Sequence, residues 1–556
     1  MSRNVNSFFS ENPASLDISR SRFERGQSHK TTFNCGELIP FYLDEVLPGD
    51  TMSIDTAKVV RLSTLISPIM DNIYLDTYFF FVPNRLVWEH WKEFMGENTQ
   101  SAWIPQVQYS VPELYSPNNG WDEGSIADYF GIPTGVKGLA VNALPFRMYA
   151  LICNEWFRDE NLTDPIFIDN TDANATGERR DSTGPYTATA SKGGKPFMVA
   201  KYHDYFTSAL PAPQKGPDVL LPIGTMAPVR TSFTDNIGAV GQGLPSLHLV
   251  NATTGLDATS SRALYVGVTS ENKSVLRSGT SNVSAPTGEF VIPSNLYADL
   301  SVATGSSINQ LRQAFQVQKL YEKDARGGTR YTEIIRSHFG VASPDARLQR
   351  PEYLGGSRVP INVTQVVQNS ETATTPQGHT SAYSLTIDSH SDFTKSFTEH
   401  GFVIGLMCAR YTHTYQQGIE RFWKRSLRED YYFPVFANLG EQAIKNYEIY
   451  AQGTDVDDQV FGYQEAWAEY RYKPNRVSGM FRSNYAQSLD FWHLADDYNA
   501  LPTLSDSWIR EDPNTVDRVI AVSSRVSDQF IADIYVKNIS VRPMPVYSVP
   551  GLIDHH

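Results

Sequence analysis

Charge is scarce in this sequence, and its balance is acidic. Only 19% of the 556 residues are charged, and the formal net charge is −14 at pH 7. Globular chains average about 25% charged residues, and disordered chains combine high net charge with few aromatics. An acidic chain is also a poor general binder of polyanions, because phosphate contacts need clustered Lys and Arg. Any nucleic-acid contact must therefore come from a local basic patch or from a separate basic partner.

Cysteines and long apolar runs are rare as well. The three cysteines, Cys35, Cys153 and Cys408, are far apart and form no CxxC pair. We interpret them as buried thiols made in a reducing cytoplasm, because a disulfide framework needs more, paired cysteines. Residues 1–30 contain no apolar core of a secretory signal, and no run approaches the ~18 apolar residues of a membrane span. We expect no membrane insertion and no export by an N-terminal signal.

Motifs for catalysis and cofactor binding are missing. The sequence contains no HExxH, GxxxxGK[ST] or GxSxG, and Ser246 stands where GxGxxG would need its third glycine. The twelve histidines are scattered, which disfavours a metal site. Glu465 and Glu469 lie close together beside Trp467, so a carbohydrate-binding or carbohydrate-active β-sandwich stays open as an alternative. A hydrolytic carboxylate pair, however, usually bridges a cleft from separate segments. We expect no enzyme, no metal and no cofactor.

Aromatic residues are abundant at 12%, and β-forming segments occur near both ends of the chain. The strand candidates are residues 72–82, 363–367, 383–387, 402–415, 519–522 and 530–541. Apolar spacing predicts helices over 86–95, within 141–160 and over 308–326. Regular β–α alternation is absent. Short strands separated by long excursions indicate an antiparallel sandwich whose sheets are completed by distant segments.

The N-terminal residues 1–30 read as a polar arm. Their net charge is +2, against −14 for the whole chain, and such an arm usually docks on another molecule or stays mobile. The basic residues of this arm are our candidates for nucleic-acid contact: Arg3, Arg20, Arg22, Arg25 and Lys30.

Two further basic stretches cover 311–350 and 410–428. Both mix Arg and Lys with aromatic residues, as single-stranded nucleic-acid sites do. Ion pairing between subunits of an acidic assembly explains the same pattern, and both interpretations stay open.

Residues 215–305, which precede both basic stretches, differ from the rest of the chain in composition: Gly, Ser and Thr make up 31 of the 91 residues. Scattered Val, Leu and Ile favour a folded insertion over a solvated linker.

Four segments carry a family resemblance. They are HKTTFNCGELIPFYLDEVLPGD (29–50), NIYLDTYFFFVPNRLVWEHWKEFMGEN (72–98), QAFQVQKLYEKDARGGTRYTEIIRSHFGVASPDARLQRPEYLGG (313–356) and PGLIDHH (550–556). Together they resemble the major capsid proteins of gokushoviruses, within the Microviridae. The resemblance covers both flanks and the middle of the chain, while 215–305 matches nothing in it.

The resemblance implies an eight-stranded antiparallel jelly roll, over residues 31–556, with long inter-strand insertions that contain some helices. It implies a virion protein that assembles, through pentamers, into a T=1 icosahedral shell around circular single-stranded DNA. Small basic packaging proteins and other minor virion proteins would be partners. Residues 215–305 would form a surface protrusion at the threefold axes that contacts a host receptor. Synthesis would take place in the cytoplasm of a host bacterium.

Overall fold

The computed structural model describes residues 19–97, 108–217, 308–328, 330–340 and 349–547, together with short segments between 219 and 298. Contacts divide the chain into two compact units. One comprises Met1–Pro213 and Asp324–His556, and the other comprises Gln214–Lys323. The predicted insertion at 215–305 lies within the second unit.

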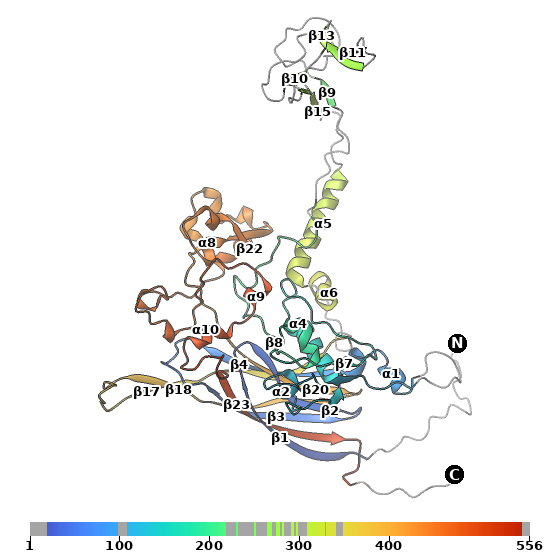
Figure 1. Ribbon diagram of the computed structural model, residues 1–556, viewed down its shortest axis with the longest axis vertical. Helices are drawn as coiled ribbons and strands as arrows, with labels where there is room; N and C mark the ends of the chain where they lie inside the picture. The colour runs from blue at the N-terminus through green and yellow to red at the C-terminus, as the bar shows by residue number, and fades with distance from the viewer. Residues whose placement is uncertain are drawn as a thin grey trace, which may run out of the picture. The chain divides into compact units, whose positions relative to one another are not determined.

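Two antiparallel sheets form the centre of the first unit (Figure 1). The four-stranded sheet has the order β1 (Ser21–Phe33), β23 (Phe530–Arg542), β3 (Thr51–Leu62) and β19 (Thr386–Ser396). The other sheet has the order β16 (Glu352–Pro360), β4 (Ile73–Pro83), β20 (Gly401–Tyr411) and β2 (Glu37–Val46), with β8 (Phe197–Met198) at its edge.

The order of these eight long strands is that of a jelly roll. Successive strands along the chain, β1 to β2 and β3 to β4, change from one sheet to the other. Within each sheet, strands from the two ends of the chain pair directly: β1 and β3 both flank β23, and β2 and β4 both flank β20. In this arrangement both edges of β23 and of β20 are paired with strands that are distant in the sequence. The predicted eight-stranded antiparallel jelly roll is confirmed.

Burial explains why the two sheets read differently in the sequence. Strand β3 alternates between buried and less buried positions, and β23 does so for most of its length, because one face packs into the core and the other is open. Strand β4 is buried almost throughout. Its inward side chains, such as Phe79, join the core between the sheets, and its other face, with Phe80, contacts a second core built around helix α3 (Leu144–Ile152).

The remaining elements lie in the long connections. The helices are α1 (Trp91–Phe94), α2 (Ile126–Tyr129), α4 (Tyr186–Thr189), α5 (Ile308–Gly327), α6 (Tyr331–Phe339), α8 (Asn446–Ile449), α9 (Asp506–Ile509) and α10 (Pro513–Asp517). The short strands of the first unit are β5 (Glu113–Tyr115), β6 (Ala140–Asn142), β7 (Ala175–Thr176), β17 (Val363–Val367), β18 (Thr380–Ser384), β21 (Glu441–Lys445) and β22 (Val460–Glu465). Those of the second unit are β9 (Val229–Thr231), β10 (Leu249–Asn251), β11 (Leu264–Val268), β12 (Ser274–Ser278), β13 (Ser281–Asn282), β14 (Val291–Pro293) and β15 (Leu296–Ala298).

Most predicted elements are confirmed, with three corrections. Residues 308–326 form α5 as expected, but the helix expected over 86–95 is reduced to the four residues of α1. The strand expected over 519–522 does not form: Ile520 makes one isolated bridge to Leu65, because this segment is a turn that inserts apolar side chains into the core. Residues 21–30, assigned to the arm, are most of β1, so the predicted boundary at residue 30 comes too late.

Candidate functional surfaces

The predicted nucleic-acid residues of the N-terminus do not form one basic patch. Arg22 and Lys30 lie on the exposed face of the four-stranded sheet, and each faces an acid: Arg22 lies 3.1 Å from Glu24, and Lys30 lies 3.5 Å from Asp533. Exposed pairs of this kind are weak and leave the cation available to another ligand. Arg3 lies outside the described residues.

Arg20 and Arg25 have structural partners. The Arg20 guanidinium donates to the carbonyl oxygen of Gly49 at 2.9 Å. Arg25 forms an ion pair with Asp44 of β2, in the other sheet, and donates to Ser540 Oγ of the neighbouring strand β23 at 2.9 Å. Burial alone would lower the pKa of Arg25, but the hydrogen bond and charge of Asp44 outweigh burial and raise this pKa. Arg25 therefore joins β1 to β2 and is not free to bind phosphate.

Several residues of the two basic stretches have partners within the chain. In the first, Arg330 forms ion pairs with Glu160 and Glu333, and the Arg350 guanidinium stacks 4.2 Å from the ring centre of Trp156. In the second, Arg410 donates to Asp76 at 2.6 Å. DNA contact and ion pairing between subunits were the two interpretations of these stretches. Pairing within the chain, a third interpretation, accounts for Arg330 and Arg410.

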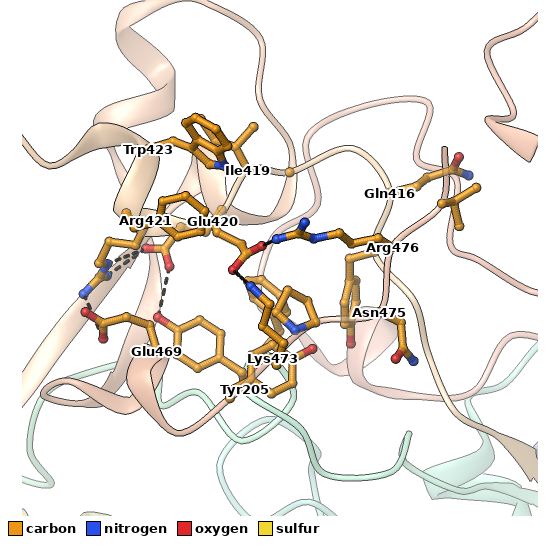
Figure 2. Close-up of a pocket in the computed structure, with 18 of the residues that line it drawn as sticks. Tyr205, Gln416, Ile419, Glu420, Arg421, Trp423, Glu469, Lys473, Asn475 and Arg476 are labelled. Atoms are coloured by element: carbon orange, nitrogen blue, oxygen red, sulfur yellow. Dashed lines mark hydrogen bonds and ion pairs between the residues drawn. The ribbon is translucent and has the colours of Figure 1, made fainter. Parts of the chain in front are cut away.

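A cavity of about 720 Å³ lies in the long connection between β20 and β23 (Figure 2). Aromatic and basic side chains from three segments line it: Tyr205 and Phe206, residues 415–425, and residues 469–482. Trp423 is 70% exposed at its rim. The labelled side chains of Figure 2 show charged groups of both signs directed toward one another across the cavity.

Charged side chains that line this cavity form ion pairs with one another. Arg421 lies 2.7 Å from Glu448, and Arg425 lies 2.9 Å from Glu469. Glu420 pairs with Lys473 at 2.6 Å and also with Arg476. Burial alone would lower the pKa of Arg421, but the carboxylate of Glu448 outweighs burial and keeps this pKa well above its usual value. The paired charges hold the loops of the connection together.

The carboxylate pair singled out in the sequence is divided between two environments. Glu465 ends β22 and pairs with Arg471 at 2.6 Å, whereas Glu469 lies in a 3₁₀ turn and pairs with Arg425. A glycosidase needs one protonated carboxyl and one free carboxylate facing the same sugar bond. Here the two carboxylates pair with two different arginines, so the arrangement does not favour the carbohydrate-active alternative.

A buried charged cluster, which no motif of the sequence indicates, joins this connection to the end of β20. His413 Nδ1 lies 2.9 Å from Asp496 Oδ1, and His413 Nε2 lies 3.0 Å from Glu511 Oε2. Lys201 Nζ lies 3.3 Å from Asp496 Oδ2. Burial alone would lower the pKa of His413, but the charges of Asp496 and Glu511 outweigh it and raise this pKa to about 9. The imidazole is therefore a cation at neutral pH, and it donates from both nitrogens.

The described part of the chain has features that bear on metal binding, membranes and thiol chemistry. No group of three or more His, Cys, Asp or Glu residues in the described ranges could hold a metal ion. No helix in those ranges is long and apolar enough to cross a membrane. Cys35, Cys153 and Cys408 are free thiols, and all three are buried.

Comparison with known proteins defines the class to which this jelly roll belongs. The model of the family described as "Capsid protein (F protein)" matches residues 12–552, so the chain belongs to this family of phage capsid proteins. It is 45% identical over 532 residues to capsid protein VP1 of Spiroplasma virus 4, covering 94% of each chain. Capsid protein VP1 of Chlamydia phage 1 is 44% identical, covering 98% of this chain and 97% of its own.

A third relative, capsid protein VP1 of Bdellovibrio phage phiMH2K, is 42% identical and covers 97% of this chain and 96% of its own. The resemblance to gokushovirus capsid proteins is therefore confirmed. The protein is a structural subunit of a virion shell and not an enzyme.

Proposed function

We propose that this chain assembles into a T=1 icosahedral shell that encloses a circular single-stranded DNA genome. The family match over residues 12–552, on a complete eight-stranded jelly roll, carries the proposal. A sandwich of this kind gives a rigid wall unit, and its long connections supply surfaces for contacts between copies. We place synthesis in the cytoplasm of the host bacterium, where the three buried thiols stay reduced.

Electron microscopy of the expressed protein tests the assembly. Negative-stain images of the purified protein should contain closed shells of uniform size or pentamers, and sedimentation should resolve the same species. A protein that stays monomeric at high concentration, with no sedimenting assembly in lysates of infected cells, would contradict the proposal.

DNA contact in this shell is proposed to be local and shared with a small basic packaging protein. The net charge of −14 opposes a general attraction to DNA, and within the two basic stretches Arg330 and Arg410 are paired with acids of the chain. The remaining candidates are the exposed Arg22 and Lys30, with Arg20 next to them and Arg3 nearer the start of the same arm.

A variant with Arg3, Arg20, Arg22 and Lys30 changed to Gln tests this contact. We expect unchanged shell yield, less DNA per particle and weaker retention of DNA at high salt. Arg25→Gln is the matched control, because Arg25 is committed to Asp44 and its loss should reduce subunit stability. Unchanged DNA content in the four-residue variant would contradict the assignment.

We propose that residues 215–305 form a surface protrusion at the threefold axes that contacts a host receptor. In support, these residues lie in a compact unit of their own, Gln214–Lys323, whose described segments form three small antiparallel sheets. Replacing 229–298 by a short Gly-Ser linker should leave shell assembly intact and abolish adsorption to host cells. Loss of assembly would instead make the insertion a part of the shell wall.

A further inference from the structure

The connection between β16 and β19 contains a β-hairpin that reaches away from the two sheets (Figure 1). We call β17 and β18, with the turn between them, the β17–β18 hairpin. Its strands pair antiparallel from Val363–Ser384 to Val367–Thr380. Beyond them, Gln368 N–H donates to the His379 carbonyl at 2.9 Å, and Gly378 N–H donates to the Gln368 carbonyl. The hairpin is therefore a preformed element.

The core anchors only the base of the β17–β18 hairpin. Ile361 is buried and donates its N–H to the Ile73 carbonyl at 2.7 Å, and Ala382 bridges to Leu65. Beyond this base, Val366 and Val367 are each 45% exposed and Tyr383 is 52% exposed. A two-stranded hairpin has marginal stability in water without a third strand or a packed face. The apolar side chains of the hairpin thus lack a covering surface.

The outer edge of β17 carries no protection against pairing. Among the described strands β17 pairs with β18 alone, so its other edge presents free backbone N–H and C=O groups. In proteins that do not associate through their sheet edges, the edge strands usually carry a Lys, a Pro or an inward charge that blocks further pairing. The sequence of β17, Val-Thr-Gln-Val-Val, contains none of these residues.

Charge decides which molecule fits this surface. From Ile361 to Thr386 the chain has one charged residue, Glu371, in the turn. A DNA strand would need Lys or Arg at the contact, which the hairpin does not have. The buried centres of protein interfaces, in contrast, are depleted of charge. A second copy of this acidic chain can approach an uncharged edge without like-charge repulsion.

We propose that the β17–β18 hairpin binds a neighbouring copy of this chain in the shell, through the free edge of β17 and the exposed side chains of Val366 and Val367. The inference rests on the proposed assembly into a shell, and it names a surface that carries the contact. A backbone edge gives the contact its hydrogen bonds, and the two valines add apolar area.

Thiol labelling of a Val366→Cys variant tests the contact directly. The native thiols of Cys35, Cys153 and Cys408 are fully buried, so the introduced cysteine is the reactive one in the folded protein. Maleimide should label this cysteine quickly in dissociated subunits. In assembled shells the labelling rate should be lower by a factor of about ten or more. Equal rates in subunits and shells would overturn the proposal. Protection found only in DNA-filled particles, and absent from empty shells, would assign the surface to DNA and overturn it as well.

A pair of substitutions at the same position gives an independent test. Val366→Lys places a charge at the edge and should reduce shell yield at least about ten-fold, with the thermal unfolding of the subunit unchanged. Val366→Thr keeps the branched shape without charge and should assemble normally. Normal assembly of the Lys variant would overturn the proposal. If wild-type protein forms no shells, the proposed function fails; if it does and these variants behave like wild type, only the hairpin contact fails.

Discussion

The buried histidine cluster at the end of β20 gives a quantitative prediction. His413 is held between Asp496 and Glu511, whose side chains are 5% and 0% exposed. His413→Gln removes the cation and leaves two buried carboxylates with Lys201 as the nearby cation. Removing one partner from a buried ion pair costs about 3 to 5 kcal/mol. We expect a loss of this size in the free energy of unfolding of the dissociated subunit near pH 6.

The cost of His413→Gln should depend on pH with a definite sign. The pKa of His413 rises from 6.5 in the unfolded chain to about 9 in the folded protein, which corresponds to about 3 kcal/mol. The folded state then binds more protons between these values, so wild-type stability is complete below pH 6.5 and falls as pH rises through 9. The difference between wild type and variant should therefore be largest near pH 6 and shrink above pH 10.

Urea unfolding followed by circular dichroism, at pH values from 6 to 10, measures this difference. Five charged or titratable residues surround His413 in the cluster: Asp496, Glu511, Lys201, Tyr498 and Tyr411. His203→Gln, at an exposed histidine, is the matched control and should change the free energy of unfolding by no more than about 0.5 kcal/mol. A stability difference between wild type and His413→Gln that stays constant over this pH range would refute the reasoning.

Two further predictions concern buried polar groups. Lys58 is 1% exposed and lies 3.3 Å from Asp388. Lys58→Met should therefore lower the free energy of unfolding by about 3 kcal/mol in urea titrations. Lys537→Met, on the open face of β23, is the control and should change it by no more than about 0.5 kcal/mol. Burial raises the pKa of the thiols of Cys35, Cys153 and Cys408; Ellman's reagent at pH 8 should therefore detect no thiol in the folded subunit and three after urea unfolding, and a fast-reacting native thiol would contradict this burial.

The sequence revealed the long strands where one physical signal dominated. Strands β4 and β20 are buried on both faces and read as near-continuous runs of apolar and aromatic residues. Strand β1 was missed because its inward positions include Arg25 and His29, which are polar. Arg25 is compensated by Asp44, a residue of a different strand, and this pairing is visible only once the strands are in place.

The charged sites were less predictable than the strands, because the paired acids and bases lie far apart in the sequence. Arginine content and neighbouring aromatics marked the region 410–428, but the partner of Arg421 is Glu448 and the partner of Arg425 is Glu469. No local spacing links His413 to Asp496 and Glu511. The sequence showed where basic residues gather, while the acids that neutralise them arrive through folding of the long connections.

These intramolecular pairs explain how an acidic chain can serve as a wall unit. Basic side chains such as Arg330, Arg410 and Arg421 pair with acids of the same chain, so their charge is not available to attract the net negative surface of a neighbouring copy. Contacts between copies must then depend on uncharged surfaces, and the β17–β18 hairpin, with a single acid between Ile361 and Thr386, is such a surface. If this division of roles is right, raising the salt concentration should leave assembled shells intact, because screening weakens exposed ion pairs and spares apolar and backbone contacts. Dissociation of DNA-free shells between about 0.1 and 1 M NaCl, monitored by sedimentation, would show that ion pairs between copies hold the wall together instead.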